Sequence, residues 1–394
     1  MTLTMNTASA DLSRREMYAE IHKLCAANSF TNWRILLQEY ATYAVLVTIC
    51  LATYHWIETP GHWIGTHGWS KWLIFPVYLL TVLAIGLWTQ NRLSCLVHEA
   101  SHFLLFKNRL LNDVAANLLV CFPFFAKISN YRAGHWGHHR HVNDPENDPD
   151  LKRLGKHQAR EFPVSKLRFL WEYLFLQMLP HKAYSYLKGR AEYIAFAKGA
   201  KLKSEKNQPL KQPWMFLLRA SYYLTLAVVL TRFEWWPYYI LLWIVPMVTV
   251  YPAALFIREI AHHGNYPDNG DYTNSRVYEG YRFERAVFFP FGEWNHVLHH
   301  MFPTIPHHRL RRAHQTMMRF GPYRDNVVIC DGFFFKGPLS PEYPIVLDVL
   351  AHRSHTYLRQ DNKADHKLEE IRSDDPHESG DRKLDTAGLL PGES

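Results

Sequence analysis

Three short clusters of histidine stand out in this 394-residue chain, because neutral imidazole is the commonest protein ligand for transition metals. Residues three and four apart on a helix share one face, so each cluster can turn two or three ring nitrogens toward one point. The tight spacing in all three clusters predicts metal chemistry. The clusters read His98-Glu-Ala-Ser-His102, His135-Trp-Gly-His138-His139-Arg-His141 and His296-Val-Leu-His299-His300.

The number of candidate donors predicts two metal ions rather than one. His263 follows a long apolar segment and is a further plausible donor, with its neighbour His262 as the alternative. One ion takes about four to six ligands, so the whole set is best shared between two. Ligation rich in nitrogen and without thiolates suits iron, copper, zinc or nickel. The expected ligands are His98, His102, His135, His138, His139, His263, His296, His299 and His300.

Carboxylates close to the clusters are expected to orient the imidazoles, because a ligating histidine usually donates its other N–H to such a group. Glu99, Asp148 and Glu259 are the main candidates for this supporting role. Three others also lie close to a cluster in sequence, namely Asp144, Asp150 and Glu293.

The first cluster also fits a competing pattern. His98-Glu99-Ala-Ser-His102 is a literal H-E-x-x-H, the zinc protease signature in which the glutamate is the general base. That reading leaves the other two clusters unexplained. His141, His307 and His308 are weaker ligand candidates, because their spacing fits the clusters less well.

The elements that must position these histidines are apolar segments long enough to cross a bilayer, which takes about 20 residues each. They lie at about 40–57, 72–90, 214–230 and 236–257, and tryptophans gather at their ends, as in interfacial belts. Residues 110–128 are apolar but contain Asn112, Asp113 and Asn117, which predicts a re-entrant or interfacial segment. The expected fold is an all-α integral membrane bundle of four transmembrane helices, rather than a soluble protein with buried helices. A cytoplasmic helical cap holds the dimetal site.

The charge distribution predicts the orientation of this bundle. Lys and Arg concentrate between residues 150 and 212, which the positive-inside rule places in the cytoplasm, together with both termini and all three clusters. The net charge of +8 then reflects topology and attraction to anionic lipid rather than nucleic-acid binding. The five cysteines form no close pair and predict neither a disulfide framework nor a zinc ribbon.

The chain divides into three expected parts. Residues 1–35 form a cytoplasmic lead-in, residues 36–350 form the membrane domain, and residues 354–394 are polar and expected to be disordered. The membrane itself is expected to be a cell inner membrane or the endoplasmic reticulum.

The three clusters, their order and their placement around two apolar hairpins resemble the membrane-bound fatty acid desaturase and hydroxylase superfamily. The stretch from His299 through Met-Phe-Pro-Thr-Ile-Pro to His307-His308-Arg-Leu is similar to the sequence after that family's third histidine box. Residues 258–264 resemble the segment where the family supplies an extra histidine before a glycine. The resemblance covers about residues 70–325. Glu99 departs from the aspartate of many members, and His262 stands where relatives often have an acidic residue.

The resemblance implies a four-span membrane enzyme with two iron ions, held by the eight box histidines and His263. Such enzymes use O2 to remove hydrogen from a lipid chain, with electrons from a separate ferredoxin or cytochrome-type protein. The favoured hypothesis is a fatty acyl or lipid desaturase. A lipid or carotenoid hydroxylase or ketolase of the same superfamily is the alternative, and a metal carrier or a zinc protease is a more distant one.

Overall fold

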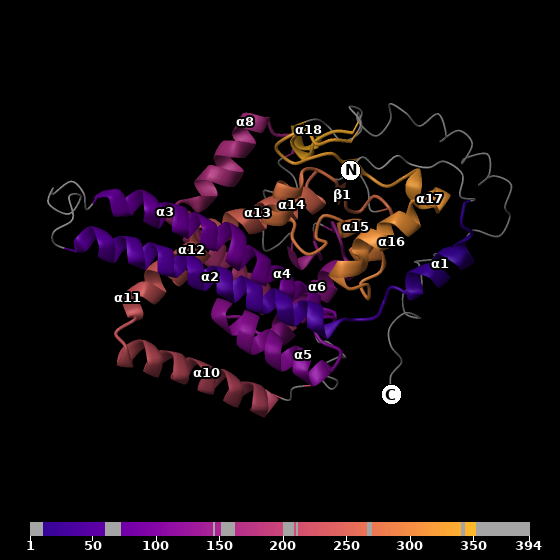
Figure 1. Cartoon of the computed structure of the whole chain (residues 1–394). Helices are drawn as coiled ribbons and strands as arrows, with labels where there is room; N and C mark the ends of the chain where they lie inside the picture. Colours follow the sequence, from indigo (N-terminus) through magenta and orange to yellow (C-terminus); the bar gives the residue numbers. More distant parts are fainter. Residues whose placement is uncertain are drawn as a thin grey trace.

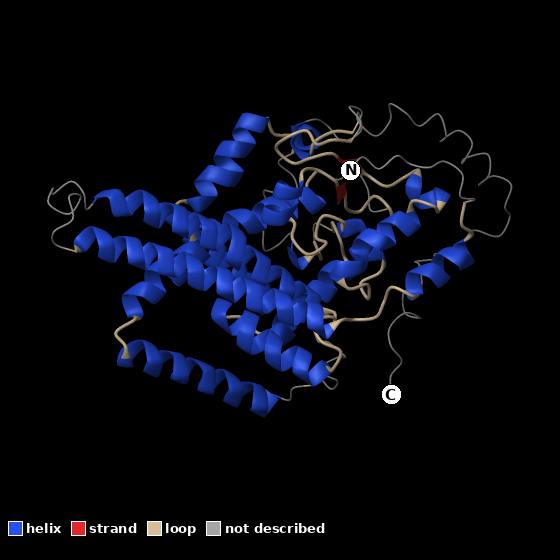
Figure 2. Cartoon of the chain, viewed as in Figure 1, coloured by secondary structure: helices blue, strands red, loops and turns tan. Residues whose placement is uncertain are grey.

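The chain folds almost entirely into helices in the computed structural model, which describes residues 11–59, 72–144, 146–150, 162–199, 209, 212–265, 270–339 and 343–351 (Figures 1 and 2). Among these residues, the strand content is one parallel pair of two-residue strands, β1 (Val277–Tyr278) and β2 (Ile329–Cys330). The expected tail at 354–394 and the first ten residues of the expected lead-in lie outside the described residues.

Four helical segments are long and apolar enough to cross a membrane. The first is α2 (Ser29–Glu58), and the third lies in α10 (Gln212–Arg232). The second joins α3 (Ile74–Ala84), η2 (Ile85–Gln90) and α4 (Asn91–Ser101). The fourth joins α11 (Trp236–Tyr239), η8 (Ile240–Ile244), α12 (Val245–Val248) and α13 (Val250–His263). The fold is therefore a helical membrane bundle.

The four spans differ in how much protein surrounds them. In the fourth span 61% of the most apolar window is buried, against 11% in the third. Figure 1 accordingly shows α10 apart from the bundle, while α12 and α13 lie within it. The fourth span is thus the central support of the bundle.

Three of the helices extend beyond the apolar segments that the sequence indicates. The first begins at Ser29, because Asn32 and Glu39 are buried inside the bundle rather than exposed to lipid. Asn32 donates to the carbonyls of Leu104 and Leu105, and Glu39 accepts from Arg92 Nε at 2.7 Å. The second and fourth helices continue to Ser101 and His263 as ordinary helix, and these extensions carry histidines.

The polar-interrupted segment after the first cluster bends back instead of crossing straight through. It comprises α5 (Arg109–Ala116), η3 (Asn117–Cys121) and η4 (Phe122–Phe124), and it meets α6 (Ile128–Arg140) at 88°. Phe125 makes the turn in the left-handed region, with φ of 57°. Asn117 holds both sides of the bend, because its side chain donates to Asp113 O and accepts from Ile128 N.

A second helical hairpin follows and packs along the fourth span. It runs through α8 (Lys166–Phe169), η5 (Leu170–Phe175) and η6 (Leu176–Met178), and it returns as α9 (Pro180–Gly199). Its first arm packs against α13 and its second against α12 and α6.

Short helices form a cap over one end of the bundle. Apolar residues of this cap share one core with Ile257 and Ile260 of α13. The cap is made of α1 (Arg14–His22), α14 (Arg282–Phe288), α15 (His296–Met301), η9 (His307–Arg309), α16 (Leu310–Met317), α17 (Gly321–Arg324) and α18 (Val346–Ala351).

Candidate metal centre

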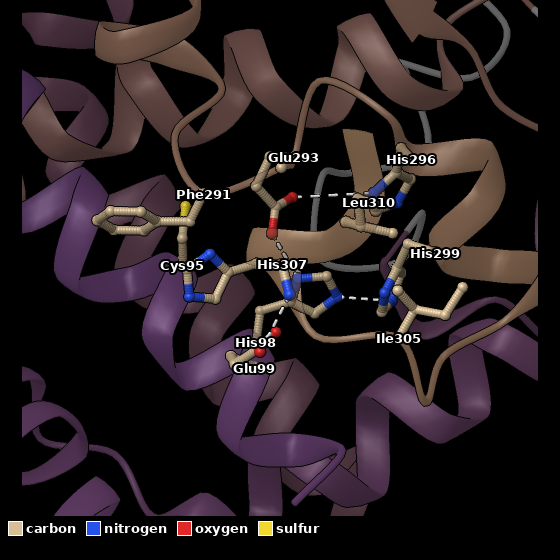
Figure 3. Close-up of a pocket in the computed structure, with 11 residues that line it drawn as sticks. Cys95, His98, Glu99, Phe291, Glu293, His296, His299, Ile305, His307 and Leu310 are labelled. Atoms are coloured by element: carbon tan, nitrogen blue, oxygen red, sulfur yellow. Dashed lines mark hydrogen bonds and ion pairs between the residues drawn. The ribbon is translucent and has the colours of Figure 1, made fainter. Parts of the chain in front are cut away.

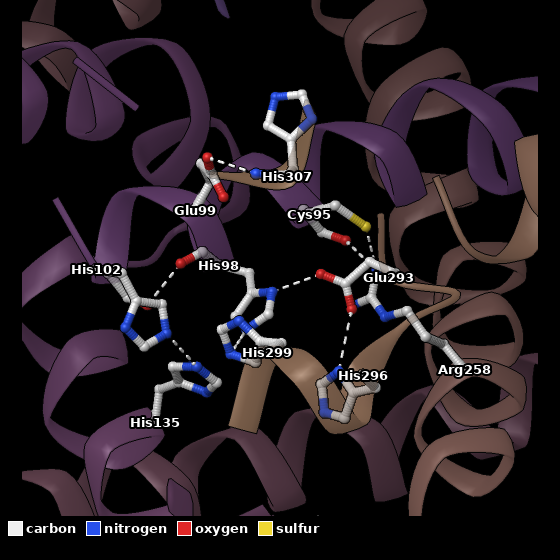
Figure 4. Close-up of polar contacts among 12 residues, drawn as sticks. Cys95, His98, Glu99, His102, His135, Arg258, Glu293, His296, His299 and His307 are labelled. Atoms are coloured by element: carbon white, nitrogen blue, oxygen red, sulfur yellow. Dashed lines mark hydrogen bonds and ion pairs between the residues drawn. The ribbon is translucent and has the colours of Figure 1, made fainter. Parts of the chain in front are cut away.

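The histidine clusters meet where the bundle joins the cap (Figure 4). His98 lies in the last turn of α4, and His102 is the residue that ends this helix. The second cluster lies on α6, the third on α15, and His263 at the end of α13. Four helices far apart in sequence therefore supply one zone of imidazoles.

The nine expected ligands form two groups rather than one. In each group, one nitrogen of every ring lies within 4.8 Å of the others. The larger group is His98, His102, His135, His139 and His299, and the smaller is His138, His263, His296 and His300.

The division follows helix geometry more closely than the sequence analysis anticipates. Residues i and i+4 stay together, as His135 with His139 and His296 with His300, while the residue at i+3 joins the other group. At 3.6 residues per turn, i+3 and i+4 lie on opposite sides of the line through residue i. Each three-histidine box therefore straddles two points instead of converging on one.

The ring nitrogens face one another within each group. His98 Nε2 lies 2.8 Å from His299 Nε2, and His135 Nε2 lies 2.9 Å from His102 Nε2. His139 Nε2 lies 3.1 Å from His135 Nε2 and 3.0 Å from His299 Nε2. In the smaller group, His138 Nε2 lies 3.3 Å from His300 Nε2.

Such an arrangement fits a cation between the rings. Burial and the neighbouring imidazoles lower the pKa of six of these histidines well below the usual value, so their rings are neutral and carry a free lone pair. Neutral lone pairs this close repel unless a metal ion or a proton lies between them. Several ring nitrogens, including both of His263, are buried without a hydrogen-bond partner. The six are His102, His135, His139, His296, His299 and His300.

Two carboxylates contact the Nδ1 atoms of His98 and His138, on the side of each ring away from its group. Glu293 Oε1 lies 2.5 Å from His98 Nδ1, and its Oε2 lies 3.8 Å from His296 Nδ1, so it touches both groups. Burial alone would raise the pKa of Glu293, but His98 lowers it to about 2. Asp148 accepts from His138 Nδ1 at 2.9 and 3.0 Å. Burial lowers the pKa of His138, but Asp148 outweighs it and raises that pKa to about 9.

The other carboxylates expected to orient histidines lie in different surroundings. Glu99 accepts from His307 N at 3.2 Å, on the side away from the imidazoles of its own box. Glu259 lines a pocket beside His138 and Asp150. Asp150 lies 3.8 Å from His138 Nδ1, whereas Asp144 is half-buried and accepts from Glu146 N and Asn147 N.

The histidines of less certain role take distinct positions. His262 is buried and stacks on His296 with ring centroids 3.9 Å apart, and it forms a third possible group with Glu293 and His296. His307 Nε2 lies 2.8 Å from Asn32 Oδ1, and His308 is half-buried. His141 is exposed at the end of α6. Of the described residues, His141, His307 and His308 belong to none of the possible metal groups.

A buried ion pair that the sequence analysis does not identify supports the larger group. Arg132 pairs with Asp113 at 2.6 Å and donates to the carbonyls of Ala100 and Ser101, which precede His102. Arg132 lies one turn before His135, so it ties α6 to the end of α4. Two features of the sequence could have indicated this ion pair. Arg132 lies three residues before His135, and Asp113 interrupts an apolar segment.

A pocket opens beside the larger group (Figure 3). Cys95, Phe291, Ile305 and Leu310 give it apolar walls, and His98 and His299 lie at its edge. Glu99 and His307 add a polar side. The pocket has room for about one water molecule next to the imidazoles.

Comparison with known proteins agrees with this geometry. The family described as Fatty acid desaturase matches residues 70–331. Dihydrorhizobitoxine desaturase of Bradyrhizobium elkanii is 28% identical over 304 residues, which cover 74% of this chain and 80% of that protein. Delta 8-(E)-sphingolipid desaturase of Komagataella phaffii is 23% identical over 64% of this chain and 49% of its own length. Fatty acid desaturase 3 of Bos taurus is 26% identical over a stretch that covers 59% of this chain and 52% of that protein. The chain therefore spans about half the length of these last two relatives.

Proposed function

Because the chain belongs to the fatty acid desaturase family, we propose that this oxidoreductase uses two iron ions and O2 to introduce a double bond into a fatty acyl or lipid chain. The observation that carries the proposal is the pair of histidine groups, five and four imidazoles on buried ends of four helices. Two iron ions bound there would supply the oxygen chemistry needed to break an unactivated C–H bond.

The protein's own contribution would be to hold neutral imidazoles in fixed directions. Asp148 would keep the Nδ1 proton on His138, so that a metal ion displaces only the proton on Nε2, and Glu293 would orient His98 through its Nδ1. Cys95, Phe291, Ile305 and Leu310 would keep the side of the centre next to His98 and His299 partly apolar. Removal of two hydrogens from adjacent carbons would give the double bond, and their two electrons and two protons, with two electrons from the donor and two further protons, would reduce O2 to two water molecules.

The electrons for this reaction would come from a separate ferredoxin or cytochrome-type protein. The metal centre lies at the cap end of the bundle. The basic stretch between residues 150 and 212 favours a cytoplasmic location for this end and for both termini.

The geometry gives less support to a zinc protease. A catalytic zinc usually keeps about three protein ligands and an open position, whereas His98 and His102 share their group with three other histidines. The carboxylate of Glu99 accepts from the backbone of His307 and is not directed at the ring nitrogens.

The proposal is tested by expressing the chain in a lipid-producing host and profiling lipids by mass spectrometry. A product lighter by two hydrogens is the expected result, and a product with one added oxygen would identify a hydroxylase instead. The purified protein is expected to hold two irons per chain. One zinc and no iron would refute the proposal.

Two neighbouring histidines provide a matched pair of variants. His263→Ala removes a member of the smaller group and is expected to cost one iron and the activity. His262→Ala, one residue earlier on α13, is expected to retain both irons. Equal iron loss in the two variants would contradict this assignment.

A further inference from the structure

The hairpin formed by α8, η5, η6 and the first half of α9 is apolar on both faces of its first arm. Phe169 and Tyr173 point inward and are buried in the core that contains Ile257 and Ile260. Leu167, Trp171 and Phe175, spaced four apart, form an outer stripe and are 79%, 56% and 49% exposed. A helix with apolar stripes on two sides usually packs against protein or membrane on both, and no described residue covers the outer stripe. The ion pair of Arg168 and Glu172 occupies another side of this arm.

The first arm is too short to cross a bilayer. Residues 166–178 would extend about 20 Å as a helix, against a hydrocarbon thickness of about 30 Å. The chain turns at Leu179 and Pro180, and α9 returns toward α6. Tyr184 and Leu187 on this second arm are also exposed, at 74% and 48%.

The position of the hairpin along the fourth span places it at the edge of the membrane. This span has 28 residues, so it is about 42 Å long and exceeds the hydrocarbon core by about 12 Å. Trp235 and Trp236 mark an interface at the far end, so the excess projects at the end that carries His263.

Contacts of the hairpin fix its depth. Phe169 and Tyr173 pack near Ile257 and Ile260, and Tyr186 meets Tyr251 edge-on at 6.2 Å. Residues 251–260 lie about 5 to 18 Å from the end of the span at 1.5 Å per residue. This range straddles the boundary between hydrocarbon and headgroups.

The charge of the hairpin suits that boundary. Residues 166–190 contain five Lys or Arg and one acidic residue, mixed with the exposed apolar side chains. Three of the five form ion pairs that stay half-exposed, Lys166 with Asp348, Arg168 with Glu172 and Lys188 with Glu192. Such a mixture is typical of helices that lie in the interface of a membrane rather than in its hydrocarbon core. Basic side chains at this depth can reach anionic headgroups while their stems cover apolar surface.

We propose that residues 166–190 form an interfacial hairpin, which inserts its outer apolar face into the membrane beside the fourth span and binds anionic lipid through its basic residues. Beyond the hairpin, the second half of α9 contacts the helix that carries the second histidine cluster. Tyr193 donates to Tyr131 O at 3.1 Å, and the Tyr131 ring stacks on His135. Gly134 lies so close to Tyr193 that a Cβ there would overlap its ring, 2.2 Å away. Attachment of the hairpin to lipid would therefore steady α6.

The test places an environment-sensitive fluorophore on single cysteines of the iron-loaded protein in lipid nanodiscs. Trp171→Cys and Phe175→Cys probe the stripe in a Cys25→Ser background, because the other four cysteines are buried. Leu224→Cys on the third span is the lipid-exposed control, and Gln315→Cys on α16 is the water-exposed one. Quenchers are lipids with a nitroxide near the headgroup and aqueous iodide.

At positions 171 and 175 we expect blue-shifted emission and protection from iodide, as at position 224, together with stronger quenching by the nitroxide lipid than at position 224. Iodide quenching equal to that at position 315 would overturn the proposal. Protection from both quenchers would also overturn the proposal. Protein, such as a second copy of the chain, would then cover the outer stripe in place of lipid.

A second comparison tests the preference for anionic lipid. Replacing phosphatidylcholine nanodiscs by ones that contain phosphatidylglycerol should increase lipid quenching at position 171, and Lys182→Glu with Lys188→Glu should abolish the increase. Equal quenching in both lipids would refute the anionic preference.

Discussion

Asp148 makes a sharp test of how the two histidine groups are supported. Its carboxylate accepts from His138 Nδ1 at 2.9 and 3.0 Å, and neither oxygen contacts a histidine of the five-member group. Asp148→Asn keeps the shape and removes the charge. Loss of a carboxylate that orients a metal-bound histidine typically costs about 10- to 100-fold in metal affinity, or about 1.4 to 2.7 kcal/mol. We expect this loss in one site of two.

The assay is iron titration of the purified protein, followed by analysis of bound metal after dialysis against a weak chelator. The variant should retain one tightly bound iron and release the other at about 10- to 100-fold lower chelator strength than the wild type. Asp144→Asn is the matched control, because Asp144 lies in the same loop but accepts hydrogen bonds from Glu146 and Asn147 and belongs to neither histidine group. Equal weakening of the binding of both irons, or the same loss of affinity in the Asp144→Asn control, would refute the reasoning.

Three further predictions follow from other contacts. Glu293→Gln should weaken both irons together in the same titration, because Glu293 touches His98 and His296; loss of one iron alone would contradict this. Asp113→Asn leaves the buried Arg132 without its counterion and should lower the free energy of unfolding by about 3 kcal/mol in chemical denaturation, and a change below 1 kcal/mol would argue against it. Burial, with Arg311 nearby, lowers the pKa of His314 to about 4, so the unfolded chain binds more protons between about pH 6.5 and 4. Stability should therefore fall by up to about 3 kcal/mol as the pH drops through that window, and His314→Gln should reduce the fall in thermal unfolding curves.

Much of the metal site could be predicted because its information is local. Spacing of three and four residues decides which imidazoles share a helix face, and it identified eight of the nine histidines that the structure brings together in two groups. The choice between His262 and His263 could not be made in this way. Adjacent residues lie about 100° apart around a helix, and the roll of α13 is set by the packing of Ile257 and Ile260 against the cap.

Contacts between segments that are far apart in the sequence could not be predicted either, because residue spacing carries only local information. Glu293 and Asp148 both lie near a box in sequence, yet only the folded chain shows that Glu293 reaches across to His98. The first span begins at Ser29 because the cap and the second span bury Asn32 and Glu39. A search of the sequence for apolar spans leaves out Asn32 and Glu39, because it takes no account of the hydrogen-bond partners that these side chains have in the folded protein.

The distribution of the histidines over the chain also sets an order of events in biosynthesis. Both groups contain residues of α15, so neither is complete until His300 has left the ribosome. By then all four spans have been synthesised, and the imidazoles of α4 and α6 have waited for more than half of the time that the chain takes to reach that point. Metal binding by the complete groups, as proposed above, would therefore follow the synthesis of all four spans, and it would stabilise only chains whose helices have already come together.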